Sequence, residues 1–140
     1  MSIQAVLAPL FVQVALTFVM LFRQGLARVG AIRRGAAKIK NTALREPNWP
    51  PEVQKLTNNY HSQLELPILF YVLTALALIT RKADLVFVVM AWLFVLSRLV
   101  HAAIHTTTNY VPRRFYAFLF GVVVLLLMWI IFAARVLTGV

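Results

Sequence analysis

The stretch "FYAFLFGVVVLLLMWIIFAA", residues 115–134, decides the fold class of this chain. It contains no charged residue, and its length meets the roughly 20 residues that a helix needs to cross a hydrocarbon core about 30 Å thick. Backbone in lipid has no water to bond with, so only helices and closed barrels can cross. Its residues do not alternate between apolar and polar as barrel strands do. The stretch therefore predicts a transmembrane helix.

Three further segments, residues 3–22, 64–80 and 85–104, have the same apolar character. The 140-residue chain is 61% hydrophobic with a mean hydropathy of +0.81, which leaves too few polar residues to cover a water-soluble fold. It contains no cysteine, which excludes disulfides, cysteine nucleophiles and cysteine metal sites. We predict one domain, residues 1–140, with an all-α integral membrane fold built as a four-transmembrane-helix bundle.

Positive charge is concentrated in two predicted loops. Residues 23–55 form the first loop, whose basic side chains are Arg23, Arg28, Arg33, Arg34, Lys38, Lys40, Arg45 and Lys55. The second loop carries Arg113 and Arg114, whereas the opposite side has Arg81, Lys82 and Arg135. The positive-inside rule then places both basic loops in the cytoplasm and both termini on the non-cytoplasmic side. We attribute the net charge of +10 to anionic lipid and membrane topology, and not to nucleic acid.

The first basic loop contains a helical pattern. Apolar residues recur at spacings of three and four, at Leu26, Val29, Ile32, Ala36, Ile39 and Ala43. This pattern predicts that the first span continues as a basic amphipathic helix, whose apolar face either touches anionic headgroups or packs on a neighbouring helix. The prolines of "REPNWPPE", residues 45–52, end that helix, and Pro51 suits the first turn of the next.

Three polar residues interrupt the third span. Arg98, His101 and His105 are three and seven residues apart, so they share one helix face. An arginine at the centre of a membrane helix costs about 2.5–3.5 kcal/mol on insertion scales. Arg98 lies in the cytoplasmic leaflet, from which a lone arginine can extend to the headgroups. Three polar groups on one face instead favour an interior site.

An acidic residue is expected at the same depth. Glu65, with His61 one turn earlier, lies at the cytoplasmic start of the second span, so an ion pair with Arg98 or a shared ligand site is within reach. A purely structural pair that fixes helix register is the alternative. Arg113 and Arg114 either anchor topology or face the same cavity. Such a positive cavity walled by apolar helices suits an anionic, water-soluble molecule that meets a lipid-soluble one.

These residues carry a family resemblance. The chain resembles the MAPEG family, the membrane-associated proteins of eicosanoid and glutathione metabolism, and is most similar to short bacterial members. The resemblance covers nearly the whole chain and is sharpest in "NNYHSQLELPILFY", residues 58–71, and "AWLFVLSRLVHAAIHTTTNYVPRRFYAF", residues 91–118. It implies a homotrimer in a membrane, expected to be the bacterial inner membrane. It also implies glutathione as co-substrate and a lipophilic electrophile or hydroperoxide as substrate.

The resemblance also implies roles for individual residues. Arg114 matches an arginine that stabilises the glutathione thiolate in some members, and we predict it as the catalytic residue. The residues predicted to bind glutathione are Glu65, Arg98, His101, His105, His61, Arg33 and Arg113. Among them, Glu65 matches the acid that holds the glutathione amine, and His105 lies where the family often has a tyrosine.

The sequence departs from the family pattern at two places. Upstream of the acid, Asn58, His61 and Ser62 stand where the pattern has Arg, Arg and Asn, so fewer cations are available for the glutathione carboxylates. In addition, Phe115 and Phe118 stand where eicosanoid-isomerising members carry a hydroxyl. A general transferase or peroxidase activity is therefore expected in preference to eicosanoid isomerisation.

Two other function classes remain open from the sequence. His101 with His105, and His61 with Glu65, have the spacing of a zinc or iron site, although Arg98 nearby would repel a cation, and we predict no metal. A non-catalytic membrane protein or small transporter, with a structural Glu65–Arg98 pair, is the other alternative.

Overall fold

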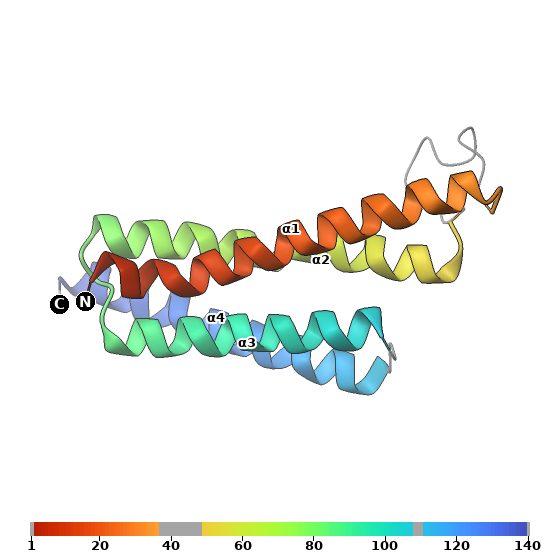
Figure 1. Ribbon diagram of the computed structural model, residues 1–140. Coiled ribbons are helices and arrows are strands. Elements are labelled where there is room, and N and C mark those ends of the chain that lie inside the picture. The colour runs from red at the N-terminus through yellow and green to blue at the C-terminus, as the bar shows by residue number, and fades with distance from the viewer. Residues whose placement is uncertain (1, 37–48, 108–110, 140) are drawn as a thin grey trace.

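Four antiparallel helices make up the described part of the chain (Figure 1). The computed structural model describes residues 2–36, 49–107 and 111–139. The helices are α1 (Ile3–Arg33), α2 (Pro51–Ile79), α3 (Leu85–Thr106) and α4 (Val111–Thr138). All four are long and apolar enough to cross a membrane. The predicted all-α membrane fold with four spans is therefore confirmed.

Helical structure enters the predicted basic loop, residues 23–55, from both sides. Helix α1 continues to Arg33, which confirms the predicted continuation of the first span as far as that residue, and α2 begins at Pro51, the predicted first turn of the next helix. Helix α1 ends where Gly35 adopts a φ of +73°, and Ala36 donates its backbone N–H to the carbonyl of Ala31 at 2.9 Å. This left-handed glycine closes the helix, so the predicted extension through Ala36 toward residue 43 is wrong at Gly35. Residues 37–48 lie outside the described chain.

The Leu26 face of α1 does not pack on α2, which was one of the two predicted alternatives for that face. Leu26 and Val29 are 74% and 49% exposed, whereas Ala31 is buried. Polar contacts select the packed face, because Arg28 donates Nε–H to Thr57 on α2 at 3.3 Å and its guanidinium lies 4.8 Å from the ring centroid of Trp49. An apolar face loses nothing by pointing at lipid, so the polar face turns inward. Packing of the Leu26 face on another described helix is therefore ruled out.

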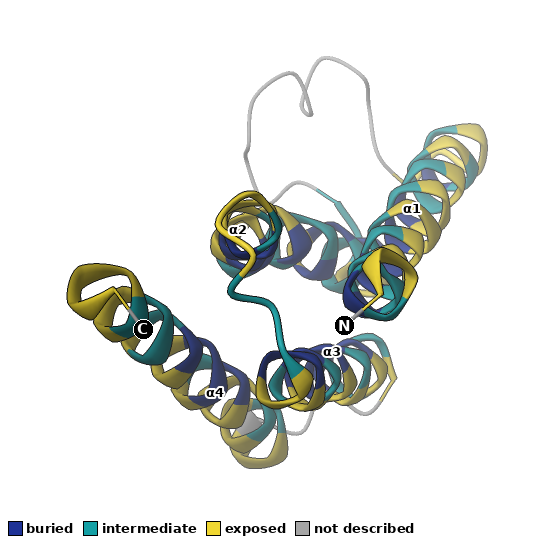
Figure 2. Cartoon of the chain, turned by 90° about the vertical axis from the view of Figure 1, so that its left-hand side faces the viewer, coloured by how far each residue is buried: buried dark blue, intermediate teal, exposed yellow. Residues whose placement is uncertain are grey.

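The helices associate mainly as two pairs, α1 with α2 and α3 with α4, and α1 also packs on α3. Seen from the end, α1 and α4 lie on opposite sides of the bundle, with their exposed faces outward (Figure 2). The core between the helices includes Phe70 and Phe94, whose rings stack with centroids 4.9 Å apart. Both termini lie at one end with the α2–α3 turn, and α1 and α2 project at the other (Figure 1).

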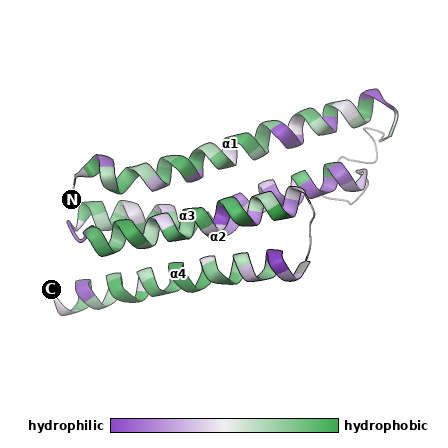
Figure 3. Cartoon of the chain, turned by 60° about the horizontal axis from the view of Figure 1, so that its bottom comes forward, coloured by the Kyte–Doolittle hydropathy of each residue, from purple (hydrophilic) through white to green (hydrophobic). Residues whose placement is uncertain are grey.

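The outer surface is apolar along most of its length. Phe11 and Phe18 on α1, and Leu126 and Ile130 on α4, are each more than half exposed. Hydrophilic residues gather mainly toward the end where α1 and α2 project (Figure 3). An apolar surface of this extent fits a lipid environment, and it leaves the polar interior as the place to look for a site.

A close approach of α3 and α4 makes Gly121 sensitive to substitution. A Cβ atom at Gly121 would lie 2.6 Å from the Ser97 hydroxyl oxygen. We expect Gly121→Ala to destabilise the protein by about 1–3 kcal/mol, because overpacking forces the helices apart. Ser97→Ala removes that oxygen, so the double variant should recover most of the loss. Thermal unfolding in detergent measures both, and a single variant as stable as the original chain would contradict the prediction.

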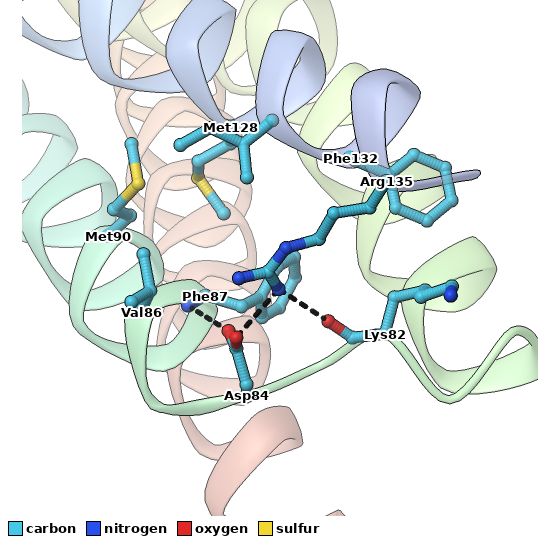
Figure 4. A pocket seen from close by; sticks show the side chains of 9 residues that line it. Lys82, Asp84, Val86, Phe87, Met90, Met128, Phe132 and Arg135 are labelled. Carbon is cyan, nitrogen blue, oxygen red and sulfur yellow. Dashed lines mark hydrogen bonds and ion pairs between the residues drawn. The ribbon is translucent and has the colours of Figure 1, made fainter. Parts of the chain in front are cut away.

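At the end that carries the termini, a charged cluster ties α4 to the α2–α3 turn (Figure 4). Asp84 caps α3 by accepting the Phe87 backbone N–H at 3.0 Å. The Arg135 guanidinium lies 2.6 Å from the other oxygen of Asp84 and donates to the Lys82 carbonyl at 3.5 Å. Partial burial opposes ionisation of Asp84, but these donors outweigh it and hold its pKa below the ordinary value.

This cluster predicts an acid-sensitive contribution to stability. Because the folded pKa of Asp84 is depressed, its stabilisation is present above the unfolded value of about 3.9 and lost as pH falls below it. We expect Asp84→Asn, which keeps a capping side chain, to weaken this dependence and to cost less than about 1 kcal/mol near neutral pH. Asp84→Ala should cost more at every pH. Unfolding midpoints measured against pH test this, and unchanged acid sensitivity in Asp84→Asn would oppose it.

Candidate functional site

Buried polar side chains converge in the interior of the bundle. They come from three helices and include Gln13, Gln24, Thr57, Asn59, Gln63, Ser97, Arg98, His101 and His105. Polar groups are costly inside a membrane protein and mark functional sites more often than not. The concentration of so many groups in one region makes it the candidate site.

Arg98 lies deepest in this region. It is 1% exposed, and its Nη2 donates to the Ser62 hydroxyl of α2 at 2.6 Å. Within the described residues, its Nε and Nη1 atoms have no hydrogen-bond partner. A buried guanidinium with unused donors is costly as pure structure and is suited to hold an anion.

The two histidines predicted to share a face with Arg98 do so. His101 and His105 are buried, with ring centroids 5.5 Å apart. The His101 ring also lies 5.9 Å from the Phe118 ring of α4. Arg114, at the start of α4, is close enough to act electrostatically on both histidines. Helix α3 thus presents its polar face to α2 and α4 together.

A hollow of about 360 Å³ opens where these three helices meet. The residues that line it are Asn58, Ser62, His101, His105, Arg114, Phe115 and Phe118. Its volume falls within the range of small-molecule sites, and its walls are cationic and polar on one side and aromatic on the other. Of the predicted residues, Arg114, His101 and His105 line the hollow. Arg98 does not line it but donates a hydrogen bond to Ser62, which does.

The remaining predicted residues lie away from this hollow. The Glu65 side chain is exposed, and Arg98 bonds to Ser62 instead of forming the expected ion pair with Glu65, whose charge still acts on Arg98 from a longer distance. Arg33 and Arg113 are exposed, and His61 is half-buried with its ring 5.9 Å from the Tyr60 ring. The structure therefore gathers part of the predicted set.

Sequence reasoning missed the contribution of α2 and α1. Gln63, Asn59 and Gln13 are fully buried and were not predicted as site residues. Asn59 and Gln63 are four residues apart, so they share a face, and that spacing was the available signal. Among the described residues, no three His, Asp or Glu side chains come together as a metal site.

The family model of the MAPEG family matches residues 6–134. Comparisons with curated proteins and with solved structures give no match. The family match covers all four spans and the polar face of α3, in agreement with the resemblance of the sequence. The chain therefore belongs to the MAPEG family, the membrane-associated proteins of eicosanoid and glutathione metabolism.

Proposed function

We propose that this protein is a membrane-bound glutathione transferase or peroxidase that acts on lipophilic electrophiles or hydroperoxides. The proposal rests on the hollow lined by Arg114, His101 and His105, and on the buried Arg98, which bonds to Ser62 in the wall of that hollow. Membership of a family of glutathione-dependent membrane enzymes supports glutathione as one substrate. A cationic hollow between helices with apolar outer faces suits glutathione together with a lipophilic molecule.

Arg114 is assigned the catalytic role. A thiol with a pKa near 8.5 is mostly protonated at neutral pH, and the thiolate is the nucleophile. A guanidinium within about 4–6 Å favours the ionised form and lowers the thiol pKa. Arg114 lies on the wall of the hollow, so a thiol bound there would ionise more readily and attack an electrophilic carbon or a peroxide oxygen.

The other polar residues are assigned to binding. The Nε and Nη1 donors of Arg98 suit a glutathione carboxylate, since charged hydrogen bonds to carboxylates are strong. His101 and His105 line the hollow and provide further polar contacts. The family resemblance assigns the glutathione amine to Glu65 and adds His61, Arg33 and Arg113 as outer contacts. Glu65, Arg33 and Arg113 are exposed and His61 is half-buried, so a ligand or a second subunit of a homotrimer could reach them.

The second substrate would arrive from the bilayer. Phe115 and Phe118 form the apolar wall of the hollow, and the exposed faces of the helices are apolar. A hydrophobic electrophile dissolved in lipid can therefore reach the thiolate without crossing water. The charge bias of the loops supports an orientation with the hollow on the cytoplasmic side, and the resemblance to bacterial members supports the inner membrane.

Turnover by detergent-purified protein tests this proposal. Glutathione would be supplied with either an aryl halide electrophile or cumene hydroperoxide, and conjugate, or alcohol with oxidised glutathione, would be quantified. We expect turnover above the uncatalysed rate with at least one acceptor. No turnover with either, and no thermal stabilisation by glutathione, would contradict the proposal. The alternative was a non-catalytic membrane protein or small transporter with a structural Glu65–Arg98 pair. It is less favoured, because Glu65 is exposed and Arg98 bonds to Ser62.

A further inference from the structure

A chain of buried side chains leads from α1 through α2 to His105. Gln13 donates Nε2–H to Gln63 Oε1 at 2.8 Å, and Gln63 donates Nε2–H to Asn59 Oδ1 at 3.1 Å. The Asn59 amide nitrogen then lies 3.5 Å from His105 Nδ1. The three amides are 0% exposed and His105 is 7% exposed, so water does not compete for these bonds.

The direction of this chain determines the protonation of His105. A primary amide donates only through its nitrogen and accepts only through its oxygen, so each bond fixes the orientation of the next side chain. Asn59 uses its oxygen to accept from Gln63 and therefore offers a nitrogen to His105. In this arrangement the Nδ1 atom of His105 accepts, which leaves the proton of the neutral ring on Nε2.

We infer that Asn59, held by Gln63 and Gln13, is a positioning residue that keeps His105 as the Nε2–H tautomer and makes it a hydrogen-bond donor to an anionic ligand atom in the hollow. His105 lines the hollow with Arg114, and its Nδ1 faces Asn59. The polar group that remains for a ligand is Nε2–H. The identity of the ligand rests on the proposed function. The Nε2–H donor would bond to the glutathione sulfur and, together with Arg114, favour the thiolate.

Nitrogen-15 NMR of histidine-labelled protein tests the tautomer directly, without any ligand. Spectra recorded above about pH 7.5, where ordinary imidazole is neutral, distinguish protonated from unprotonated ring nitrogens. The His105 signals are assigned by their loss in His105→Gln, or by subtraction with His61→Gln and His101→Gln. We expect Nε2–H as the main form in the unmodified protein. A main form with the proton on Nδ1 would overturn the inference.

A pair of variants tests the role of Asn59. Asn59→Asp replaces the donor with an acceptor, so the proton of His105 should move to Nδ1. The matched control is Gln54→Glu, which also exchanges an amide for a carboxylate on α2 but lies outside the lining of the hollow. The control should leave the tautomer unchanged. A tautomer that responds to neither variant, or equally to both, contradicts the positioning role.

A second readout separates this inference from the proposed function. With glutathione present, Asn59→Ala should lower the ionisation constant of the bound thiol by about tenfold, the effect of losing one hydrogen bond to a charged group. If the tautomer is as inferred but glutathione does not bind the unmodified protein, only the proposed function fails. If glutathione binds and ionises while His105 carries its proton on Nδ1, only the inference fails.

Discussion

Substitution of Arg114 by alanine is expected to abolish the ionisation of bound glutathione at neutral pH. Arg114 lies on the wall of the hollow with His101 and His105. An opposite charge within about 4–6 Å lowers an acid's pKa by about 1–3, so its loss should lower the ionisation constant of the bound thiol by about tenfold to a thousandfold. Absorbance of the thiolate, recorded against protein alone, measures the effect, and turnover should fall with it.

Two controls make the Arg114 result specific. Arg114→Lys keeps the charge but loses the planar donor geometry, so it should retain part of the thiolate signal. Arg81→Gln removes an exposed cation from the turn at the opposite end of the bundle and should leave the signal intact. A full signal in Arg114→Ala, or an equal loss in Arg81→Gln, would contradict the catalytic assignment.

Replacement of Arg98 by methionine is expected to remove glutathione binding without lowering the stability of the fold. Arg98 is 1% exposed, and two of its nitrogen atoms have no partner among the described side chains. Replacing a buried charge whose donors are incompletely used by an apolar residue of similar length removes the cost of desolvating that charge. The variant should therefore keep or raise its unfolding temperature in the absence of glutathione, and lose the stabilisation that glutathione gives.

The opposite pattern would assign Arg98 to structure alone. A fall in unfolding temperature by many degrees, with glutathione stabilisation preserved, would show that Arg98 fixes the helices and does not contact ligand. Ser62→Ala provides the matched control, because it removes the hydroxyl that accepts from Arg98 at 2.6 Å and keeps the charge. We expect this control to weaken glutathione binding modestly and to leave the site occupied at high concentration.

The spans could be predicted because they depend on the length and hydrophobicity of single segments of the sequence. A long uncharged run such as residues 115–134 has one stable solution in lipid, whatever its neighbours are. The face of α1 that turns toward α2 was not predictable in the same way. Leu26 and Val29 formed a regular apolar face, but in a membrane an apolar face gains little from packing, and the contact between Arg28 and Thr57 decided which side turned inward.

The site was predicted on α3 and only partly on α2, for a geometric reason. Arg98, His101 and His105 interrupt an apolar run, so their shared face was visible from spacing alone. Depth suggested that Glu65 would meet Arg98, but depth does not fix direction around a helix. Glu65 lies two residues after the buried Gln63, about 200° around the helix at 3.6 residues per turn, and so points outward. The buried residues of α2 that lead to His105 are Asn59 and Gln63. They were not predicted, because the segment around them is polar throughout.

The most direct test of the account is the absorbance of the thiolate when glutathione is added to the purified, unmodified protein at neutral pH. Addition of S-methylglutathione, which has no ionisable thiol, gives the baseline. The account predicts a saturable thiolate band that approaches one thiolate for each occupied hollow and is missing with the methylated analogue. Saturable binding of glutathione without that band, or no binding at all, would contradict the claim that this cationic hollow activates a thiol.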